Sequence, residues 1–202
     1  MKRLHIFAGA VLAGAAIAVG GILYLSVEPK ALGAVLFTVG LYTICAHGLM
    51  LYTGKVGYAL DGGLSYLADL AIIWAGNLLG TFACARLAAA TRLGPALYSS
   101  AVRLCGPKLT DSLPSLFILG VFCGLLMFSA VDGYKRKGEP LILFACVAAF
   151  ILCGFEHCVA DMFYFSMARA WSPSAWAAIA AISLGNSAGG LLIPLAGKLK
   201  KE

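Results

Sequence analysis

Apolar residues fill long stretches of this chain and do not alternate with polar ones. Six stretches are near or above the roughly 20 residues that a helix needs to cross a membrane. Such runs favour helices, because a helix satisfies its own backbone hydrogen bonds in lipid. We predict one all-α integral membrane domain over residues 1–202, with spans at about 4–27, 31–56, 64–90, 113–131, 141–168 and 175–199.

Two of these spans are interrupted by polar or flexible residues. The second span meets Thr53-Gly54-Lys55, and the fifth carries the stretch GFEHCVADM, Gly154 to Met162. The span after each interruption contains the pattern GNxxG, at Gly76–Gly80 and at Gly185–Gly189. This arrangement is typical of a two-fold repeat with discontinuous helices near the membrane midplane. Close packing of helices at small residues is the alternative interpretation.

Glu156, His157 and Asp161 lie within six positions of each other inside an apolar segment. Ionisable groups at that depth are costly and persist where they line a cavity, pair with each other or do chemistry. On a continuous helix Asp161 would lie one turn from His157 and favour its charged form. Alternatively, Asp161 would cap the helix that restarts after the interruption.

The composition agrees with a membrane protein and excludes several other classes. The chain is 61% hydrophobic and 12% charged, against about 45–50% and about 25% in soluble domains. The net charge of +6 is spread over segment ends, so we expect a lipid bilayer and no nucleic acid as its partner. The seven cysteines include no C-x-x-C pair and indicate buried thiols, with no metal site and no cofactor.

The charge distribution also predicts an orientation. We interpret the first apolar stretch as a retained span, since it is too long for the core of a signal peptide. An even number of spans places both termini on one side, and an excess of Lys and Arg marks the cytoplasmic side. The side of the termini would hold Lys2, Arg3, Lys55, residues 135–137, Lys198, Lys200 and Lys201.

Four motifs in order along the chain carry a family resemblance. They are FTVGLYTICAHGLMLYTGKV (Phe37 to Val56), GPKLTDSLPSLFILGVFCG around Lys108, GFEHCVADM and GNSAGG. With these motifs the chain resembles the formate/nitrite transporter family, pentameric channels for formate, nitrite or hydrosulfide. The resemblance implies six transmembrane helices, with the second and fifth broken, in an inverted three-plus-three repeat like that of aquaporins. It also implies a homopentamer in the bacterial cytoplasmic membrane.

The resemblance further assigns roles to individual residues. It implies that His157 lines the middle of a pore, that Thr53 faces it and that Lys108 lies in the outer vestibule. The sixth-helix asparagine would be Asn186, with Glu156 and Asp161 in support, although members often carry Asn at the position of Asp161. The constrictions would be formed by Phe37, Leu41, Leu51 and Phe150.

The resulting hypothesis is a channel for small weak-acid anions, with formate the leading substrate and nitrite or hydrosulfide the alternatives. Lys108 would attract the anion. His157 would then let it cross with a proton, because the reference pKa of histidine, about 6.5, allows proton exchange at physiological pH. Two other classes stay open: a membrane-embedded acid–base enzyme that uses the Glu-His-Asp cluster, and an assembly subunit without a pore.

Overall fold

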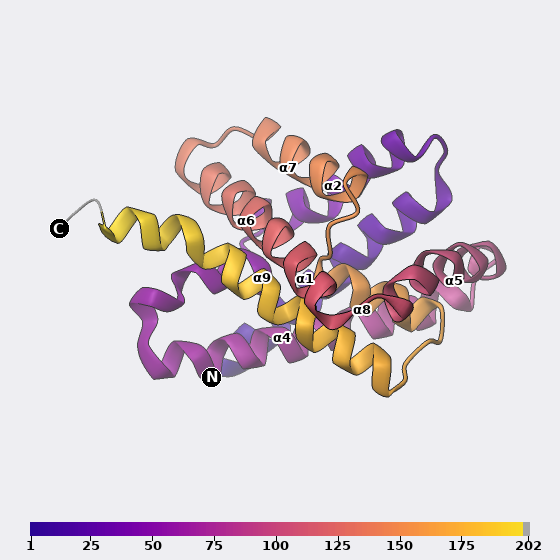
Figure 1. Cartoon of the computed structure of the whole chain (residues 1–202), viewed down its shortest axis with the longest axis horizontal. Helices are drawn as coiled ribbons and strands as arrows, with labels where there is room; N and C mark the ends of the chain where they lie inside the picture. Colours follow the sequence, from indigo (N-terminus) through magenta and orange to yellow (C-terminus); the bar gives the residue numbers. More distant parts are fainter. Residues whose placement is uncertain (200–202) are drawn as a thin grey trace.

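The computed structural model describes residues 1–199, which form helices joined by short connections, with no strand in this range (Figure 1). Lys200 and Lys201, which enter the predicted orientation, lie outside the described residues. In chain order the elements are α1 (Lys2–Ser26), α2 (Lys30–Ala46), α3 (Tyr52–Lys55), the 3₁₀ helix η1 (Val56–Tyr58), α4 (Ala59–Ala89), α5 (Gly94–Thr110), α6 (Leu113–Lys137), α7 (Leu141–Leu152), α8 (Cys158–Met167) and α9 (Pro173–Leu199).

The second and fifth predicted spans are each two helices. The interruption of the second span was predicted at the wrong position. Thr53, Gly54 and Lys55 are helical, within α3, and the chain leaves the helix earlier, between α2 and α3. There Gly48 has φ +63, a left-handed conformation that glycine adopts without steric cost. Gly154, with φ +69, occupies the same place in the connection between α7 and α8.

The connection between the third and fourth predicted spans contains the helix α5. Its apolar residues Leu97, Ala101 and Cys105 recur every four positions and are buried. A stripe of that period places one face of a helix against the protein. Because the rest of the segment is polar and basic, no membrane span is predicted from its sequence, although it is helical.

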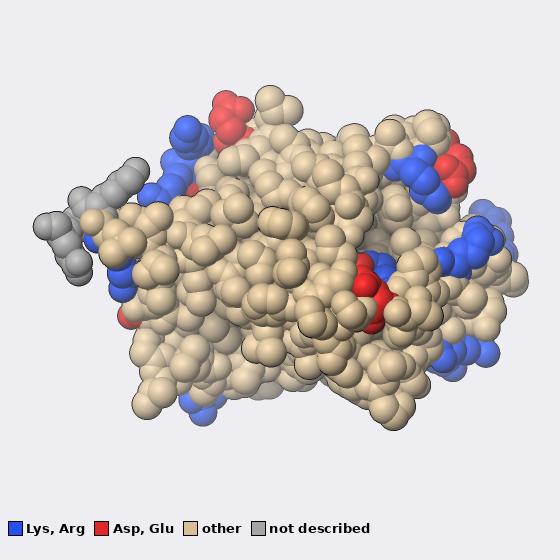
Figure 2. All heavy atoms as spheres, in the orientation of Figure 1, with Lys and Arg blue, Asp and Glu red and all other residues tan. Residues whose placement is uncertain are grey.

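In the part of the chain that the structure describes, four helical segments are long and apolar enough to cross a membrane, namely Lys2–Ser26, Tyr52–Ala89, Leu113–Lys137 and Pro173–Leu199. Most charged atoms visible in Figure 2 lie toward the two ends of the long axis, with a wide uncharged zone between them. The N-terminus and the end of α9 both lie in the left half of Figure 1. Large apolar side chains such as Leu12, Leu79, Phe122 and Leu184 are exposed, as expected of a surface that faces lipid.

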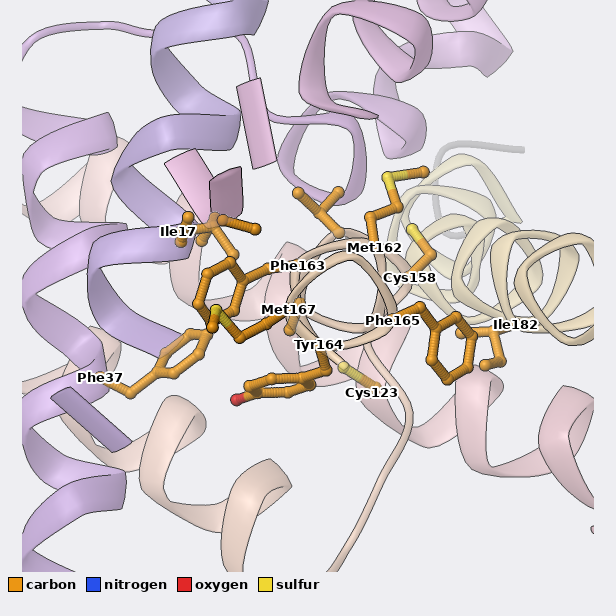
Figure 3. Packing of buried hydrophobic residues seen from close by; sticks show 14 of the residues in the cluster. Ile17, Phe37, Cys123, Cys158, Met162, Phe163, Tyr164, Phe165, Met167 and Ile182 are labelled. Atoms are coloured by element: carbon orange, nitrogen blue, oxygen red, sulfur yellow. The ribbon is translucent and has the colours of Figure 1, made fainter. Parts of the chain in front are cut away.

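The short helix α8 lies at the centre of the core. All ten of its residues are buried. Figure 3 shows Met162, Phe163 and Phe165 pointing to different sides of the core, with Phe163 toward Ile17 and Phe37. A helix that is enclosed by the core on all sides has a fixed position. The residues next to α8 are therefore fixed as well.

The GNxxG motifs lie at two close helix crossings. A Cβ atom built on Gly80 of α4 would come within 2.0 Å of the carbonyl oxygen of Val11 in α1. One built on Gly189 of α9 would come within 1.9 Å of the carbonyl oxygen of Val121 in α6. The backbones therefore meet at a distance that only glycine allows.

This contact gives a stability prediction. The change Gly189→Ala should lower stability by about 1–3 kcal/mol, because the added methyl group forces α6 and α9 apart. Gly197→Ala, on the same helix, is the matched control, since nothing lies within 4 Å of a Cβ there. Thermal unfolding of the purified protein in detergent measures both. Equal midpoints for the two variants would contradict the close contact.

Candidate functional site

His157 lies at the start of α8 and joins the two interruptions. Its Nδ1 accepts a hydrogen bond from the backbone N–H of Ala160 at 3.0 Å, which caps the helix. Its Nε2 lies 2.9 Å from the Oγ1 of Thr53, the second residue of α3. Both side chains are buried, so this contact lies inside the protein.

The cap fixes the tautomer of His157. A backbone N–H can only donate, so Nδ1 is unprotonated and the ring proton lies on Nε2. Nε2–H therefore donates to the hydroxyl of Thr53, whose own proton is free to rotate to another acceptor. In this arrangement the imidazole is neutral and presents a hydrogen-bond donor toward α3.

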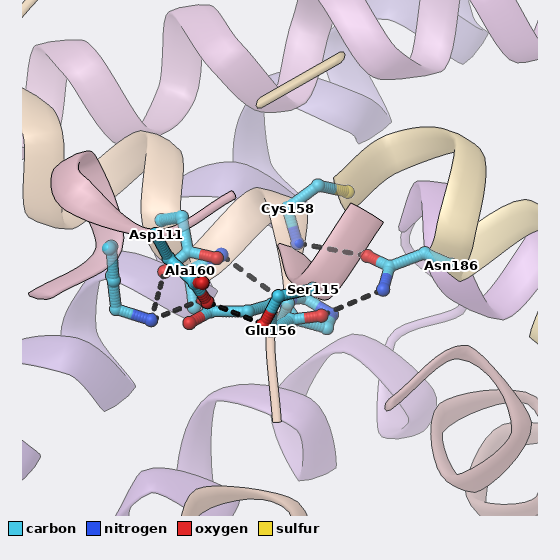
Figure 4. Close-up of polar contacts among 9 residues, drawn as sticks. Asp111, Ser115, Glu156, Cys158, Ala160 and Asn186 are labelled. Carbon is cyan, nitrogen blue, oxygen red and sulfur yellow. Dashed lines mark hydrogen bonds and ion pairs between the residues drawn. The ribbon is translucent and has the colours of Figure 1, made fainter. Parts of the chain in front are cut away.

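Asn186 holds the backbone around His157. Its Oδ1 accepts from the N–H of Cys158 at 2.9 Å, and its Nδ2 donates to the carbonyl oxygens of Glu156 and Gly120, each at 2.8 Å (Figure 4). The interruption leaves the N–H of Cys158 and the carbonyl group of Glu156 without helical partners. One buried amide satisfies both and joins them to Gly120, inside α6.

Asn77 does the same at the other interruption. Its Oδ1 accepts from the N–H of Tyr52 at 2.9 Å, and its Nδ2 donates to the carbonyl oxygens of Met50 at 2.9 Å and Ala10 at 2.8 Å. Leu51 thus has the same position relative to the Asn77 contacts as His157 has relative to the Asn186 contacts. The GNxxG pattern pointed to Asn77 as well as Asn186, yet the sequence-based set of site residues omitted it.

Lys108, at the end of α5, is paired with both acidic residues of the cluster. Its Nζ contacts the Glu156 carboxylate and lies 3.0 Å from Oδ1 of Asp161. The side chains are 13%, 6% and 1% exposed for Lys108, Glu156 and Asp161, so this charged group is largely out of solvent. The expectation that Asp161 caps the restarted helix was wrong, because His157 is the cap. The carboxylate of Asp161 forms its ion pair with Lys108.

The four predicted constriction residues are all buried. The Phe150 ring stacks on the imidazole with centroids 5.6 Å apart, and Phe37 meets Phe150 edge-on at 5.9 Å. Leu41 and Leu51 are at most 1% exposed and belong to the same apolar cluster.

Two hollows adjoin these residues, one beside Phe150 and His157 and the other beside Leu51. One, of about 50 Å³, is lined by Lys108, Phe150, His157, Asp161 and their neighbours, and a volume of this size has room for water. The other, of about 240 Å³, is lined by Leu51, Gly54, Lys55 and, from the far end of α6, Tyr134 and Lys135, among others. Sequence reasoning did not single out Lys55 and Lys135 as site residues, because their convergence depends on the turn after α2.

Neither hollow has the ligands of a metal centre. Within residues 1–199, no three or more His, Cys, Asp or Glu side chains are grouped to hold a metal ion.

The sequence profile described as "Formate/nitrite transporter" matches residues 1–197. The chain belongs to this family. Its membership, predicted from the four motifs, is thereby confirmed.

Several relatives in the formate/nitrite transporter family have names that state transport. The chain is 32% identical to the transporter YwcJ of Bacillus subtilis over 66% of its length and 57% of the relative. It is 30% identical to the nitrite transporter NirC of Salmonella typhimurium, over 73% of the chain and 59% of the relative. It is 26% identical to the formate channel FocB of Escherichia coli, over 84% and 68%. The matched region thus spans a little over half the length of YwcJ and NirC.

Solved structures of the family share the whole architecture. A pentameric formate channel with formate bound superposes with a TM-score of 0.83 at 25% identity, covering 99% of this chain and 98% of that one. A second ion channel of the family gives a TM-score of 0.82 at 24% identity, over 98% of this chain and 90% of that one, and supports the fold.

The Asn186 contacts predict a large loss of stability when the amide group is removed. Asn186→Ala removes three buried hydrogen bonds and leaves the N–H of Cys158 and the carbonyl group of Glu156 without partners, which should lower stability by about 2–5 kcal/mol. Thermal unfolding in detergent measures this loss. Asn77→Ala should cost about as much, because Asn77 makes the same three bonds.

The matched control is Ser187→Ala, next to Asn186 on α9. It removes a hydroxyl that contacts Tyr52 and is only partly buried. We expect a much smaller loss there. An Asn186→Ala protein as stable as Ser187→Ala would contradict the role of the amide.

Proposed function

We propose that this chain forms a membrane channel for small monovalent weak-acid anions, with formate as the first candidate substrate. The observation that carries the proposal is the buried His157–Thr53 hydrogen bond, which joins the two interruptions between the two hollows. The family match and the names of FocB and NirC support an anion as the transported species. Formate precedes nitrite and hydrosulfide because the similar solved channel contains formate.

The proposed topology has six membrane crossings in two inverted halves of three, as in aquaporins. In this scheme α2 with α3 and α7 with α8 make the broken second and fifth crossings. The matching bonds of Asn77 and Asn186 support this scheme, since each amide spans one interruption. Half-helices that meet at mid-membrane place free backbone N–H groups and helix N-termini where an anion passes.

The proposed pathway runs from the hollow beside Lys108 to the hollow beside Lys55. Between them the anion passes Phe150 and Phe37, then His157 and Thr53, then Leu51. Burial of a charged solute among apolar rings costs several kcal/mol unless it is hydrogen-bonded. The Nε2–H of His157 and the hydroxyl of Thr53 supply such bonds between the two hollows, and a neutral weak acid would avoid most of the cost.

Proton coupling at His157 carries a structural condition in this scheme. A second ring proton would have to be placed on Nδ1, which accepts the bond from Ala160. Protonation therefore breaks the cap of α8. We propose that His157 acts as a neutral hydrogen-bond donor while the cap is closed, and takes up a proton only when the start of α8 opens.

The assembly is proposed by similarity. The related formate channel is a pentamer, and we propose a homopentamer with one pathway per subunit. We place it in the cytoplasmic membrane of a bacterium, with both termini on the cytoplasmic side, as the distribution of Lys and Arg favours.

Flux through reconstituted protein tests the function. Purified protein in proteoliposomes should pass formate, and a panel with nitrite and hydrosulfide at two pH values ranks the substrates. Empty liposomes are the control. No flux of any panel anion would contradict the proposal, and chemical conversion of the anion would indicate an enzyme instead.

A single substitution separates the chemistry of His157 from its capping role. His157→Asn keeps a side-chain acceptor suited to an N-cap but removes the ring donor at Nε2 and the titratable group. We expect a folded protein in which formate flux falls at least about tenfold, from the loss of a hydrogen bond in a buried path. His47→Asn, at an exposed histidine after α2, should leave flux unchanged. Equal flux in the two variants would place the pathway elsewhere.

A further inference from the structure

The group formed by Lys108, Glu156 and Asp161 contains one basic and two acidic side chains. One ammonium group contacts two carboxyl groups, and all three side chains are mostly or fully out of solvent. With every group ionised the site would hold a net charge of −1 in the protein interior. A buried charge without a partner costs far more than a paired one.

The contacts of Asp161 show where this imbalance falls. Its Oδ1 pairs with Lys108 at 3.0 Å, while its Oδ2 is buried and has no hydrogen-bond partner among the described residues. The carboxyl groups of Asp161 and Glu156 contact the same Nζ atom of Lys108, so they lie close to each other. Two negative charges held that close in the protein interior repel each other, and this repulsion favours a proton on one of the two. Carboxyl pairs that share one site hold a single proton in this way.

The other groups around Asp161 do not balance the charge. His157 is neutral while it caps α8, and thiols and phenols are neutral near neutral pH. Lys108 and Glu156 are then the charged partners that remain. The titratable neighbours are Tyr24 on α1, Cys105 on α5, Cys123 on α6, and Cys158 and Tyr164 on α8.

We propose that Glu156 and Asp161 together bind one proton at neutral pH, so that they and Lys108 form a charge-neutral group beside the pathway. One of the two carboxyl groups that contact Lys108 holds this proton. A protonated Asp161 has one donor and one acceptor, as an asparagine side chain has. Unlike asparagine, it can release its proton.

This proton-binding site lies where it would affect transport. That consequence rests on the proposed function. Asp161, Lys108 and His157 line the same hollow of about 50 Å³. With the proton bound, an anion there meets no net charge. Once the proton leaves, the site carries −1 and repels anions at a few ångströms through a medium that screens poorly. Passage of anions should therefore fall as the pH rises through the loss of this proton.

Infrared spectroscopy detects the proton without any transport. Purified protein in lipid at neutral pH should show the C=O stretch of a protonated carboxyl group, shifted in D₂O and lost on raising the pH. The chain has only nine Asp and Glu residues, so the band is resolvable. It should disappear in both Asp161→Asn and Glu156→Gln, because the one carboxylate that remains is then balanced by Lys108.

Asp132→Asn is the matched control, since Asp132 is a buried aspartate paired with a single arginine, Arg136. The band should persist in that variant. Absence of the band in the wild-type protein at neutral pH overturns the proposal, as does its persistence in both Asp161→Asn and Glu156→Gln. Where a variant fails to fold, the wild-type spectrum and its loss at alkaline pH decide alone.

Formate flux supplies the second measurement. Between neutral and alkaline pH, flux should fall roughly tenfold more in wild-type protein than in Asp161→Asn, where Lys108 and Glu156 stay balanced. The effect of pH on the substrate is the same in both proteins and cancels in this ratio. Equal falls overturn the consequence for transport. A protein that passes no anion but shows the band contradicts the proposed function and leaves the proton site supported.

Discussion

Two asparagine amides make the interrupted backbone possible. A chain that leaves a helix inside a membrane exposes N–H and carbonyl groups that lipid cannot satisfy, and each such group costs several kcal/mol. Asn77 and Asn186 each satisfy one N–H and one carbonyl group of an interruption, and each also bonds a carbonyl oxygen of a continuous helix, Ala10 in α1 or Gly120 in α6. The left-handed glycines Gly48 and Gly154 turn the chain at the same points. Without these amides the segments with Leu51 and His157 would have to become helical or be exposed to water.

These amides in turn depend on the glycines that flank them. Asn77 and Asn186 reach the opposite backbone because their helices pack almost in contact, at Gly80 against Val11 and at Gly189 against Val121. A larger residue would move the amide away from carbonyl oxygens now 2.8 Å from it. The motif GNxxG therefore contains both the hydrogen-bonding group and the close approach that it needs, which is a physical reason for its presence in each half.

The sequence predicted what depends on local pattern and missed what depends on turns and distant pairing. Long apolar runs identified the four helical segments that are long and apolar enough to cross a membrane, and the motifs identified the family. The interruption of the second span was predicted at Thr53–Lys55 because that stretch contains a glycine and a charge. The turn instead occurs at Gly48, in a mostly apolar segment. The helix α5 was missed since its stripe of small apolar residues is weak. The partner of Asp161 could not be predicted, because Lys108 is brought to it only when α5 folds against α8.

The pairing of Lys108 changes how an anion would be drawn into this protein. A lysine with no counter-ion attracts anions by its full charge, whereas Lys108 contacts two carboxyl groups and has little net field to offer. In the proposed pathway, attraction beside Lys108 would then come from hydrogen-bond donors and from helix N-termini, which act over short distances. At the other end of that pathway Lys55 and Lys135 line the larger hollow. The two hollows therefore differ in charge, although the same kind of amide contact holds the backbone near each. Such a pathway would favour small solutes that accept hydrogen bonds and lose their charge easily, and this is the character of a weak acid.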